Sequence, residues 1–472
     1  MILTARCPTA IRRNSTLPHK IPEYPRRGGL RGRQKAGGVC LHSPPSPKYH
    51  NTEYNTKTLS YLGDGLLSHP LPTFFPGLLR QGIPEIFAAP AARPAGTYTA
   101  SSGARLAFIG GLLIIILMAL AGCDKAASPQ IEFALGTVCR VNLYEGGTRQ
   151  LYSRIFARVR EIDRTMTVYA GEFQDMIGGE EIVDPDGKSA AMYQAAAQAL
   201  TSGVVAINER AGVEPVKVRA DLLDVLEKAL RYAALSDGAF DPTVGPLVQL
   251  WGIGTDRQRI PDDAEIALAR ELVNWRDVAI DRGAGTAFLL RRGMALDLGA
   301  IAKGYAGDEA ARIAREAKAK RAIFDLGGNI VALGWREQKK SLPWRVGIQN
   351  PLGERNAYLG VVTVHDASVV TSGVYERYFE SGGKRYHHIL STASGYPVEN
   401  GLLSVTIVTA SSTDADALST AVFTLGFERG KALIDSIPEA EAIFVFSDRS
   451  VRITGGLAGI FTLTDNEFEV LP

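Results

Sequence analysis

A carboxylate and a hydroxyl lie four residues apart near the C-terminal end of the chain, as Asp416 and Thr420 in the run ADALSTAVF. On a helix, residues at this spacing lie one turn apart on the same face. Carboxylate, hydroxyl and backbone carbonyl oxygens are the hard ligands that Mg²⁺ takes, with waters and substrate phosphates completing its shell. By itself the spacing favours a helix with a solvated acid. We expect Thr413 and Asp414, just upstream, to cap that helix.

A second set of candidates lies between Met294 and Gly328, where an apolar run carrying Asp297 leads through Gly299 into a helix with Lys303 in its first turns. A strand, a glycine turn and a helix N-terminus present backbone N–H groups and a positive dipole end to an anion. A carboxylate and an ammonium beside that turn could hold the polar edge and the phosphate of a nucleotide. Such units are common in α/β domains, so this segment alone is a weak signal.

A histidine pair supplies the third candidate. His387 and His388 are the only histidines after His365. A neutral imidazole is the right group for a general base that works near pH 7. A buried strand histidine is the alternative interpretation.

Four segments together carry a resemblance to a known family. They are SDGAFDPTVGPLVQLWGIG, MALDLGAIAKGYAGD, TSGVYERYFESGGKRYHHIL and SSTDADALSTAVFTLG. In this order they resemble the four signature blocks of the ApbE family, the FAD:protein FMN transferases, and the resemblance runs from about Leu135 to the C-terminus. It implies Mg²⁺-dependent transfer of the FMN moiety of FAD to a Thr or Ser hydroxyl of a partner protein, with release of AMP. Family partners include subunits of membrane redox complexes of the Rnf and Nqr type.

The resemblance also implies a role for individual residues. His388 and Asp416 would be catalytic, and Asp416, Thr420 and the carbonyl of Ala300 would bind Mg²⁺. The FAD contacts would fall on Leu135, Tyr169, Ala239, Phe240, Asp241, Asp297 and Lys303. Core packing is the alternative for Phe240, and both roles are compatible.

Two departures from the family pattern leave other activities open. The acid and proline that usually follow the histidine block are replaced by Ser391-Thr392-Ala393-Ser394-Gly395. An insertion of about residues 173–201 follows Tyr169, and Gly203 stands where the family has Glu. The alternatives are therefore an Mg²⁺-dependent FAD pyrophosphatase, which would give FMN and AMP, and a flavin-binding protein without chemistry.

An export signal precedes the matched region. Arg105 is followed by a short apolar stretch that ends in Leu120-Ala121-Gly122-Cys123. A positive residue, a short apolar core and small residues before a break are typical of a secretory signal, and the core is short of the roughly 20 residues of a spanning helix. The ending resembles a bacterial lipoprotein signal over residues 104–122, with Cys123 lipidated and residues 123–131 as a tether. Asp124 resembles the signal for retention in the inner membrane, so we expect a lipid-anchored protein on its periplasmic face.

The first hundred residues differ from the rest in charge. They carry 13 Lys and Arg against four acidic residues and 13 of the 24 prolines, whereas the remainder holds 39 basic against 46 acidic residues. Such a segment cannot bury enough apolar surface to offset its ordering entropy. We expect residues 1–103 to be a disordered basic tail outside the mature protein, and not a nucleic-acid-binding arm.

Periodicity and short gaps predict alternating strands and helices over residues 132–472, with mixed, mostly antiparallel sheets and flanking helices. The resemblance implies an α+β, T-fold-like architecture with the cofactor in a cleft. Cys139 lies among alternating apolar residues, which indicates a buried strand cysteine. The strands are expected at Phe133–Tyr144, Val278–Ile280, Ala295–Leu298, Ala322–Leu326, Val346–Ile348, Tyr358–Val364 and Ser404–Val408, with a hairpin at Ser381–Gly383. The helices are expected at Leu151–Thr165, Asp221–Leu235, Asp262–Leu272 and Ile301–Lys318.

Overall fold

The computed structural model describes residues 128–168 and 203–472, which belong to one unit that spans residues 99–472. The basic tail, the signal segment, Cys123, Tyr169 and the insertion at 173–201 lie outside the described residues. The first strand begins at Gln130, within the expected tether.

The helices are α2 (Arg149–Met166), α5 (Val204–Glu209), α6 (Ala220–Leu235), α7 (Gly245–Trp251), α8 (Asp263–Glu271), α9 (Ala302–Glu316), α10 (Ser412–Leu425) and α11 (Phe427–Asp435). The strands are β1 (Gln130–Ala134), β2 (Thr137–Leu143), β3 (Val216–Lys217), β4 (Val278–Asp281), β5 (Thr286–Leu289), β6 (Ala322–Leu326), β7 (Asn329–Leu333), β8 (Trp344–Gln349), β9 (Tyr358–Val364), β10 (Ala367–Gly373), β11 (Tyr378–Ser381), β12 (Lys384–His387), β13 (Leu402–Thr409), β14 (Glu441–Phe446), β15 (Ser450–Ile453), β16 (Phe461–Leu463) and β17 (Glu469–Val470).

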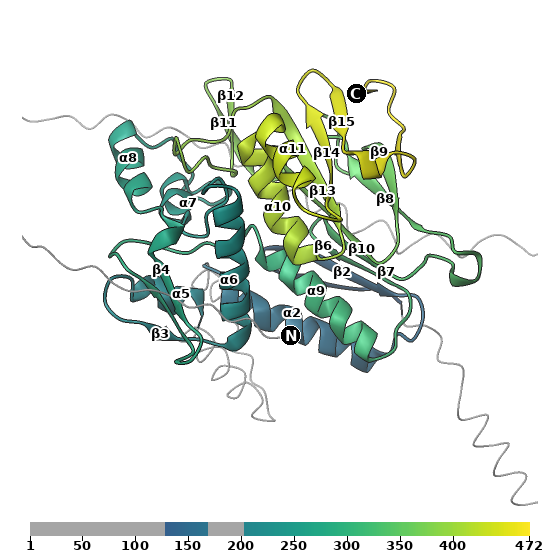
Figure 1. The fold of residues 1–472 in the computed structure, drawn as a ribbon, viewed down its shortest axis with the longest axis horizontal. Helices are drawn as coiled ribbons and strands as arrows, with labels where there is room; N and C mark the ends of the chain where they lie inside the picture. The colour runs from purple at the N-terminus through teal and green to yellow at the C-terminus, as the bar shows by residue number, and fades with distance from the viewer. Residues whose placement is uncertain (1–127, 169–202) are drawn as a thin grey trace, which may run out of the picture. The chain divides into compact units, whose positions relative to one another are not determined.

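A nine-stranded sheet organises the unit, in the order β1-β2-β6-β7-β10-β13-β14-β15-β17. Every pairing in it is antiparallel except β15 with β17. Helices α2, α9, α10 and α11 pack side by side along this sheet (Figure 1). The predicted α+β class with mostly antiparallel sheets is confirmed.

The two faces of the large sheet carry separate apolar cores. Along β14, Ala442 and Phe444 pack in the core that includes the helices, whereas Ile443 and Val445 pack in the core that includes β8 and β9 of the β16-β9-β8 sheet. Successive strand side chains point to opposite faces, so an uninterrupted apolar run is what a strand covered on both sides requires.

A smaller cluster surrounds Trp251 at the end of α7, with Leu247, Ile266 and Leu390. The indole Nε1 donates to the carbonyl of Gly395 at 2.8 Å. This contact ties α7 to the segment that follows the histidine pair.

Most predicted elements occur within a few residues of their expected bounds, including β6 and β9, whose bounds agree in full. Two strand predictions are wrong. Phe133–Tyr144 is not one strand but the β1–β2 hairpin, which turns at Leu135 and Gly136 with φ of 55° and 67°. Ala295–Leu298 makes a single bridge, from Ala295 to Val244, and no strand.

The α10 cap also differs from the expectation. The cap is Ser411, whose hydroxyl accepts a hydrogen bond from the Asp414 amide, and Thr413 and Asp414 lie inside the helix. No helix in the described part of the chain is long and apolar enough to cross a membrane.

Candidate active site

The predicted metal ligands on α10 lie at the start of α9. Asp416 is 3% exposed, and its Oδ2 accepts a hydrogen bond from the Gly304 amide at 2.8 Å. Its Oδ1 lies 3.8 Å from Lys303 Nζ, beyond hydrogen-bond length. One turn further along the helix, the Thr420 hydroxyl lies 3.1 Å from the Ser372 hydroxyl of β10. The helix periodicity thus places both α10 ligands toward α9 and β10.

The turn before α9 is organised by its own polar groups. Asp297 Oδ1 accepts from the Gly299 amide at 2.8 Å, and Lys303 Nζ donates to the Gly299 carbonyl at 3.1 Å. In a helix that began earlier, the Gly304 amide would pair with the carbonyl of Ala300, four residues before it. Here that amide donates to Asp416, so α9 does not draw this carbonyl into its hydrogen-bond ladder.

These oxygens fit a hard cation. Asp416 supplies the charge, and the Thr420 hydroxyl of α10 and the Ala300 carbonyl just before α9 are neutral oxygen ligands. The 3.8 Å separation between Asp416 Oδ1 and Lys303 leaves the carboxylate oxygen open to a closer cation. In residues 128–168 and 203–472 no group of three or more His, Cys, Asp or Glu is arranged to hold a metal, so a metal here would depend on this single carboxylate.

His388 is held by the backbone of Arg377. The His388 amide donates to the Arg377 carbonyl at 3.0 Å, and the ring Nδ1 lies 3.2 Å from the same oxygen. A carbonyl can only accept, so Nδ1 carries the hydrogen and Nε2 keeps its lone pair in the neutral ring. Burial and the Arg377 charge, with a smaller effect of Lys303, hold the pKa of His388 well below its usual 6.5. The ring is therefore a neutral base at pH 7.

The surroundings of His387 indicate a structural role instead. It is buried, its Nδ1 accepts from the Ile389 amide, and its Nε2 lies 2.9 Å from the Val398 carbonyl. Its ring meets Phe423 edge-to-face at 5.9 Å. Burial lowers its pKa. Of the two histidines, His387 is the satisfied core residue.

The Ala239–Asp241 segment is largely committed to internal bonds. Phe240 is buried in the main core, and Ala239 is partly exposed. Asp241 Oδ1 accepts from the amide and hydroxyl of Thr243 at 2.8 and 2.7 Å, and Oδ2 accepts from the Trp275 amide at 3.0 Å. Burial raises the pKa of Asp241. The carboxylate therefore shapes this loop, and a cofactor would meet backbone groups and Ala239 more readily than this acid.

Hydrogen bonds join the four sequence blocks into one site. The Asp297 amide donates to the Pro242 carbonyl at 2.8 Å, and the Thr392 hydroxyl donates to the Gly238 carbonyl at 2.7 Å. Together with the Gly304–Asp416 bond and the Ser372–Thr420 bond, these contacts connect all four blocks. The segment that departs from the family pattern, Ser391–Gly395, is thus in direct contact with the block predicted to bind the cofactor.

Leu135 lies apart from these bonds, in the β1–β2 turn. It is partly buried against the main core, and its backbone hydrogen-bonds Asp163 of α2. That bond opposes the burial that raises the pKa of the Asp163 carboxyl. Cys139, on the next strand, is buried, and its thiol pKa is raised to about 12, mainly by burial. The prediction of a buried strand cysteine at Cys139 is confirmed.

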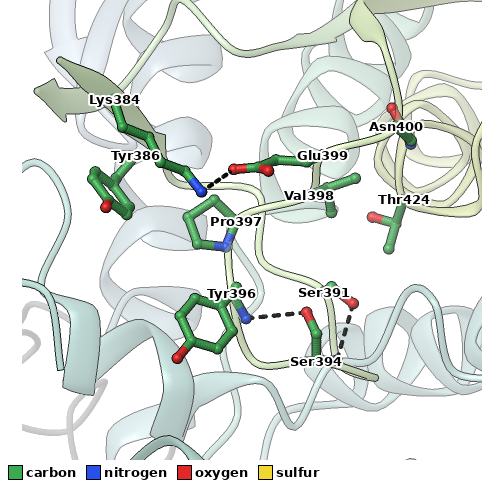
Figure 2. A pocket seen from close by; sticks show the side chains of 10 residues that line it. All are labelled: Lys384, Tyr386, Ser391, Ser394, Tyr396, Pro397, Val398, Glu399, Asn400 and Thr424. Carbon is green, nitrogen blue, oxygen red and sulfur yellow. Dashed lines mark hydrogen bonds and ion pairs between the residues drawn. The ribbon is translucent and has the colours of Figure 1, made fainter. Parts of the chain in front are cut away.

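A surface pocket of about 440 Å³ lies beside the divergent segment. Figure 2 shows its lining, with the Lys384–Glu399 ion pair and the Ser391–Ser394 turn. Thr424 of α10 also contributes to it. No predicted site residue lines this pocket, so it is distinct from the group around Asp416.

Comparison with known proteins agrees with this arrangement. The family model described as "ApbE family" matches residues 186–444, beginning inside the segment expected as an insertion. A Treponema pallidum protein named FAD:protein FMN transferase is 36% identical over 373 residues, which cover 76% of this chain and 96% of that protein. A Klebsiella pneumoniae protein of the same name is 38% identical over 270 residues, 57% of this chain and 83% of its own length.

Solved structures give the same result. The ApbE protein of Thermotoga maritima is 30% identical, with a TM-score of 0.58, covering 70% of this chain and 98% of that one. The flavin transferase ApbE of Vibrio cholerae is 25% identical, with a TM-score of 0.54, covering 67% and 93%. The chain belongs to the ApbE family.

The ApbE blocks thus hold the predicted residues in two groups. In the first, Asp416 lies against Gly304 and Lys303 at the start of α9, with Thr420 one turn further along α10, and the positive charge of Lys303 contributes to the lowered pKa of His388. Ala239, Phe240 and Asp241 form the second, joined to the first through Pro242 and Asp297.

Two residues of the site were not singled out from the sequence. Ser372 contacts Thr420, and Arg377 holds His388 through its carbonyl. Both lie in the ApbE block TSGVYERYFESGG, which runs up to the histidine pair. Their place in that block was the available signal.

Proposed function

We propose that this chain is an Mg²⁺-dependent FAD:protein FMN transferase that joins FMN to a Thr or Ser hydroxyl of a partner protein and releases AMP. The curated relatives that support this are named for FMN transfer from FAD to protein. The observation that carries the proposal is the buried Asp416, with Lys303 and Thr420 beside it, at the positive N-terminus of α9.

The metal would be held by Asp416, Thr420 and the carbonyl of Ala300. When bound, Mg²⁺ would neutralise pyrophosphate charge as the bond to AMP breaks. Lys303, near Asp416, adds a second positive group on the same side. Asp297, Lys303 and the turn between them would hold the nucleotide, with Leu135, Tyr169 and the Ala239–Asp241 segment contributing further contacts.

His388 supplies the base in this proposal. Its neutral Nε2 would take the proton of the acceptor hydroxyl while that oxygen attacks the FMN phosphorus. The phosphorus–oxygen bond to the AMP moiety breaks, and AMP leaves with the bonding electrons. The contact with the Arg377 carbonyl supports this role because it orients the ring and sets its tautomer.

The setting of the reaction follows from the signal segment. We propose that Cys123 is lipidated and anchors the enzyme on the periplasmic face of the bacterial inner membrane. The acceptor would then be a subunit of a membrane redox complex of the Rnf or Nqr type. The Leu120–Cys123 ending and Asp124 support this placement.

A second candidate, Mg²⁺-dependent FAD pyrophosphatase activity, is favoured by one observation. The segment Ser391–Gly395, which departs from the family pattern, reaches Gly238 through Thr392 beside the predicted cofactor block. If this contact opens the site to water, water would replace the acceptor hydroxyl.

Incubation of the protein with FAD, Mg²⁺ and a protein bearing a threonine acceptor motif distinguishes these functions. Transfer predicts an acceptor heavier by one FMN group together with free AMP. Hydrolysis predicts free FMN and AMP with an unmodified acceptor. Unchanged FAD would contradict both and indicate a flavin-binding protein.

Asp416→Ala tests the metal within the same assay. Loss of the charged ligand should abolish Mg²⁺-dependent product formation, because two neutral oxygens do not hold the ion. Full activity in this variant, or in excess chelator, would contradict the metal assignment.

A further inference from the structure

Asp308 of α9 caps the N-terminus of α10. Its Oδ1 accepts from the Ser412 amide at 2.8 Å, and its Oδ2 accepts from the Ser411 hydroxyl, the Thr413 amide and the Thr413 hydroxyl at 2.9, 2.9 and 2.6 Å. The first amides of a helix have no intrahelical partner and carry the positive end of its dipole. One carboxylate therefore satisfies two orphan amides and the hydroxyls of Ser411 and Thr413.

The converse bond runs from α10 to α9. Asp416 of α10 accepts from the Gly304 amide, in the first turn of α9. Asp416 caps the amide of Gly304, which lies four residues before Asp308. Asp308 caps the amide of Ser412, which lies four residues before Asp416. The two helix ends thus pass each other in opposite directions, and each is capped by a carboxylate of its neighbour.

Two glycines make this approach possible. A Cβ at Gly304 would lie 2.2 Å from the Ser412 carbonyl oxygen and 2.7 Å from Asp416 Cβ, and one at Gly307 would lie 3.1 Å from the Ser412 hydroxyl. Glycine inside a helix costs about 1 kcal/mol relative to alanine, so its presence here reflects the need for contact. With larger residues the helices would separate and neither acid would reach its cap.

We infer that Asp308 is a positioning residue for the transfer site, which sets Asp416 and Thr420 against the start of α9. The inference rests on the metal site of the proposed function. Sliding or tilting of α10 along α9 would move Asp416 and Thr420 away from the Ala300 carbonyl. The Asp308 cap opposes that motion at a point one helical turn from Asp416.

Glu309, the next residue, provides a matched control. Its carboxylate accepts from Arg158 of α2 at 2.8 Å and from Arg312 at 2.7 Å. It therefore ties α9 to α2 and contributes to stability through a different face of the same helix. Its replacement should leave the α9–α10 contact in place.

The test compares Asp308→Asn with Glu309→Gln in the full chain. An amide at position 308 keeps the size but turns an NH₂ group toward donors. Binding of Mn²⁺ in the presence of FAD is followed by electron paramagnetic resonance, and transfer is measured against Mg²⁺ concentration. Partners that orient metal ligands are worth about 10–100-fold in affinity, so Asp308→Asn should weaken Mn²⁺ binding by that factor. Excess Mg²⁺ should restore much of its transfer rate.

Glu309→Gln should lower the melting temperature yet keep Mn²⁺ affinity within about twofold of the wild type, less than the 10–100-fold effect of an orienting partner. Thr413→Val removes one bond to Asp308 without a change of charge, and serves as the test if Asp308→Asn does not fold. It should weaken Mn²⁺ binding in the same direction as Asp308→Asn, by a smaller factor. The inference would be overturned if Asp308→Asn and Thr413→Val both bound Mn²⁺ with wild-type affinity and Asp416→Ala did not bind it. Wild-type protein that binds no Mn²⁺ would overturn the metal site of the proposed function, and this inference with it.

Discussion

At the scale of single residues, the environment separates the two histidines. His388 has its Nδ1 at the Arg377 carbonyl and a lowered pKa, whereas His387 is enclosed by Ile389, Val398 and Phe423. The sequence could not show this difference, because His387 ends β12 and His388 follows it, and only the fold decides which of the two rings is enclosed.

The first prediction concerns His388→Asn. Loss of the base should lower transfer by about 10²–10⁴-fold with little change in FAD affinity. In the wild type the rate should hold as pH falls through 6.5 and decline only well below it, since burial and Arg377 lower the pKa of this group. Fixed-time assays with mass detection of the product across pH 5–8 measure the loss of transfer in the variant and the pH dependence of the wild type. If His388→Asn transferred FMN at the wild-type rate but had a lower melting temperature, His388 would be only a packing residue.

The second prediction concerns His387 and stability. Its folded pKa is lowered, so below the unfolded value of about 6.5 the unfolded chain binds a proton that the folded chain does not. The titration of this residue should therefore leave the free energy of unfolding unchanged above pH 6.5. Below it, the free energy should fall by up to about 1.4 kcal/mol per pH unit until the folded pKa is reached.

Urea unfolding at pH 7.5, 6.5 and 5.5 tests this, with His387→Gln for comparison. The variant should be less stable at pH 7.5 but lose less stability on acidification than the wild type. Parallel pH curves for the two proteins would exclude a buried neutral His387.

At the scale of elements, the sequence predicted helices better than turns. Asp221–Leu235 was recognised because apolar spacing and Gly238 mark a helix and its stop, and α6 agrees within a residue. The β1–β2 turn was missed because Leu135 adopts positive φ, a conformation that favours Gly and Asn. The strand expected at Ala295–Leu298 failed because its apolar residues are buried in the core with only one bridge to a neighbour.

The third prediction concerns the crossing of α9 and α10. Helix propensity alone predicts that Gly304→Ala gains about 1 kcal/mol. The crossing predicts the opposite sign, because the added Cβ would lie 2.2 Å from the Ser412 carbonyl oxygen, and overpacking typically costs about 1–3 kcal/mol. Chemical denaturation should show a net loss of stability.

Gly455→Ala serves as the control for this substitution, because nothing lies within 4 Å of a Cβ at Gly455. It should be close to neutral. A stabilised Gly304→Ala protein would contradict the close contact.

At the scale of the whole molecule, the order of the four blocks predicted the family and the residues of the candidate site. It could not predict that Asp241 bonds the Trp275 amide or that Ser372 meets Thr420, because these partners lie 34 and 48 residues apart in the sequence and only the fold brings them together.

The fourth prediction concerns the anchor. Cys123→Ser should release the protein from membranes or leave it uncleaved, because no lipid can be attached to the serine. Membrane fractionation and intact-mass measurement follow both outcomes, and the wild type should begin at a lipidated Cys123. Wild-type protein that retains Met1 and the basic tail in the membrane fraction would contradict the anchor and the assignment of residues 1–103.

The reciprocal capping of α9 and α10 also bears on how the chain opens in solution. The amides of Gly304, Ser412 and Thr413 donate across the helix pair, so solvent reaches them only when the two helices part. Amides at helix ends normally exchange with deuterium early, through local fraying. Here those three should exchange late and together, at the rate of amides in the middle of the large sheet. A cation bound at Asp416 would slow them further, which would make deuterium uptake at these helix ends a reporter of metal occupancy.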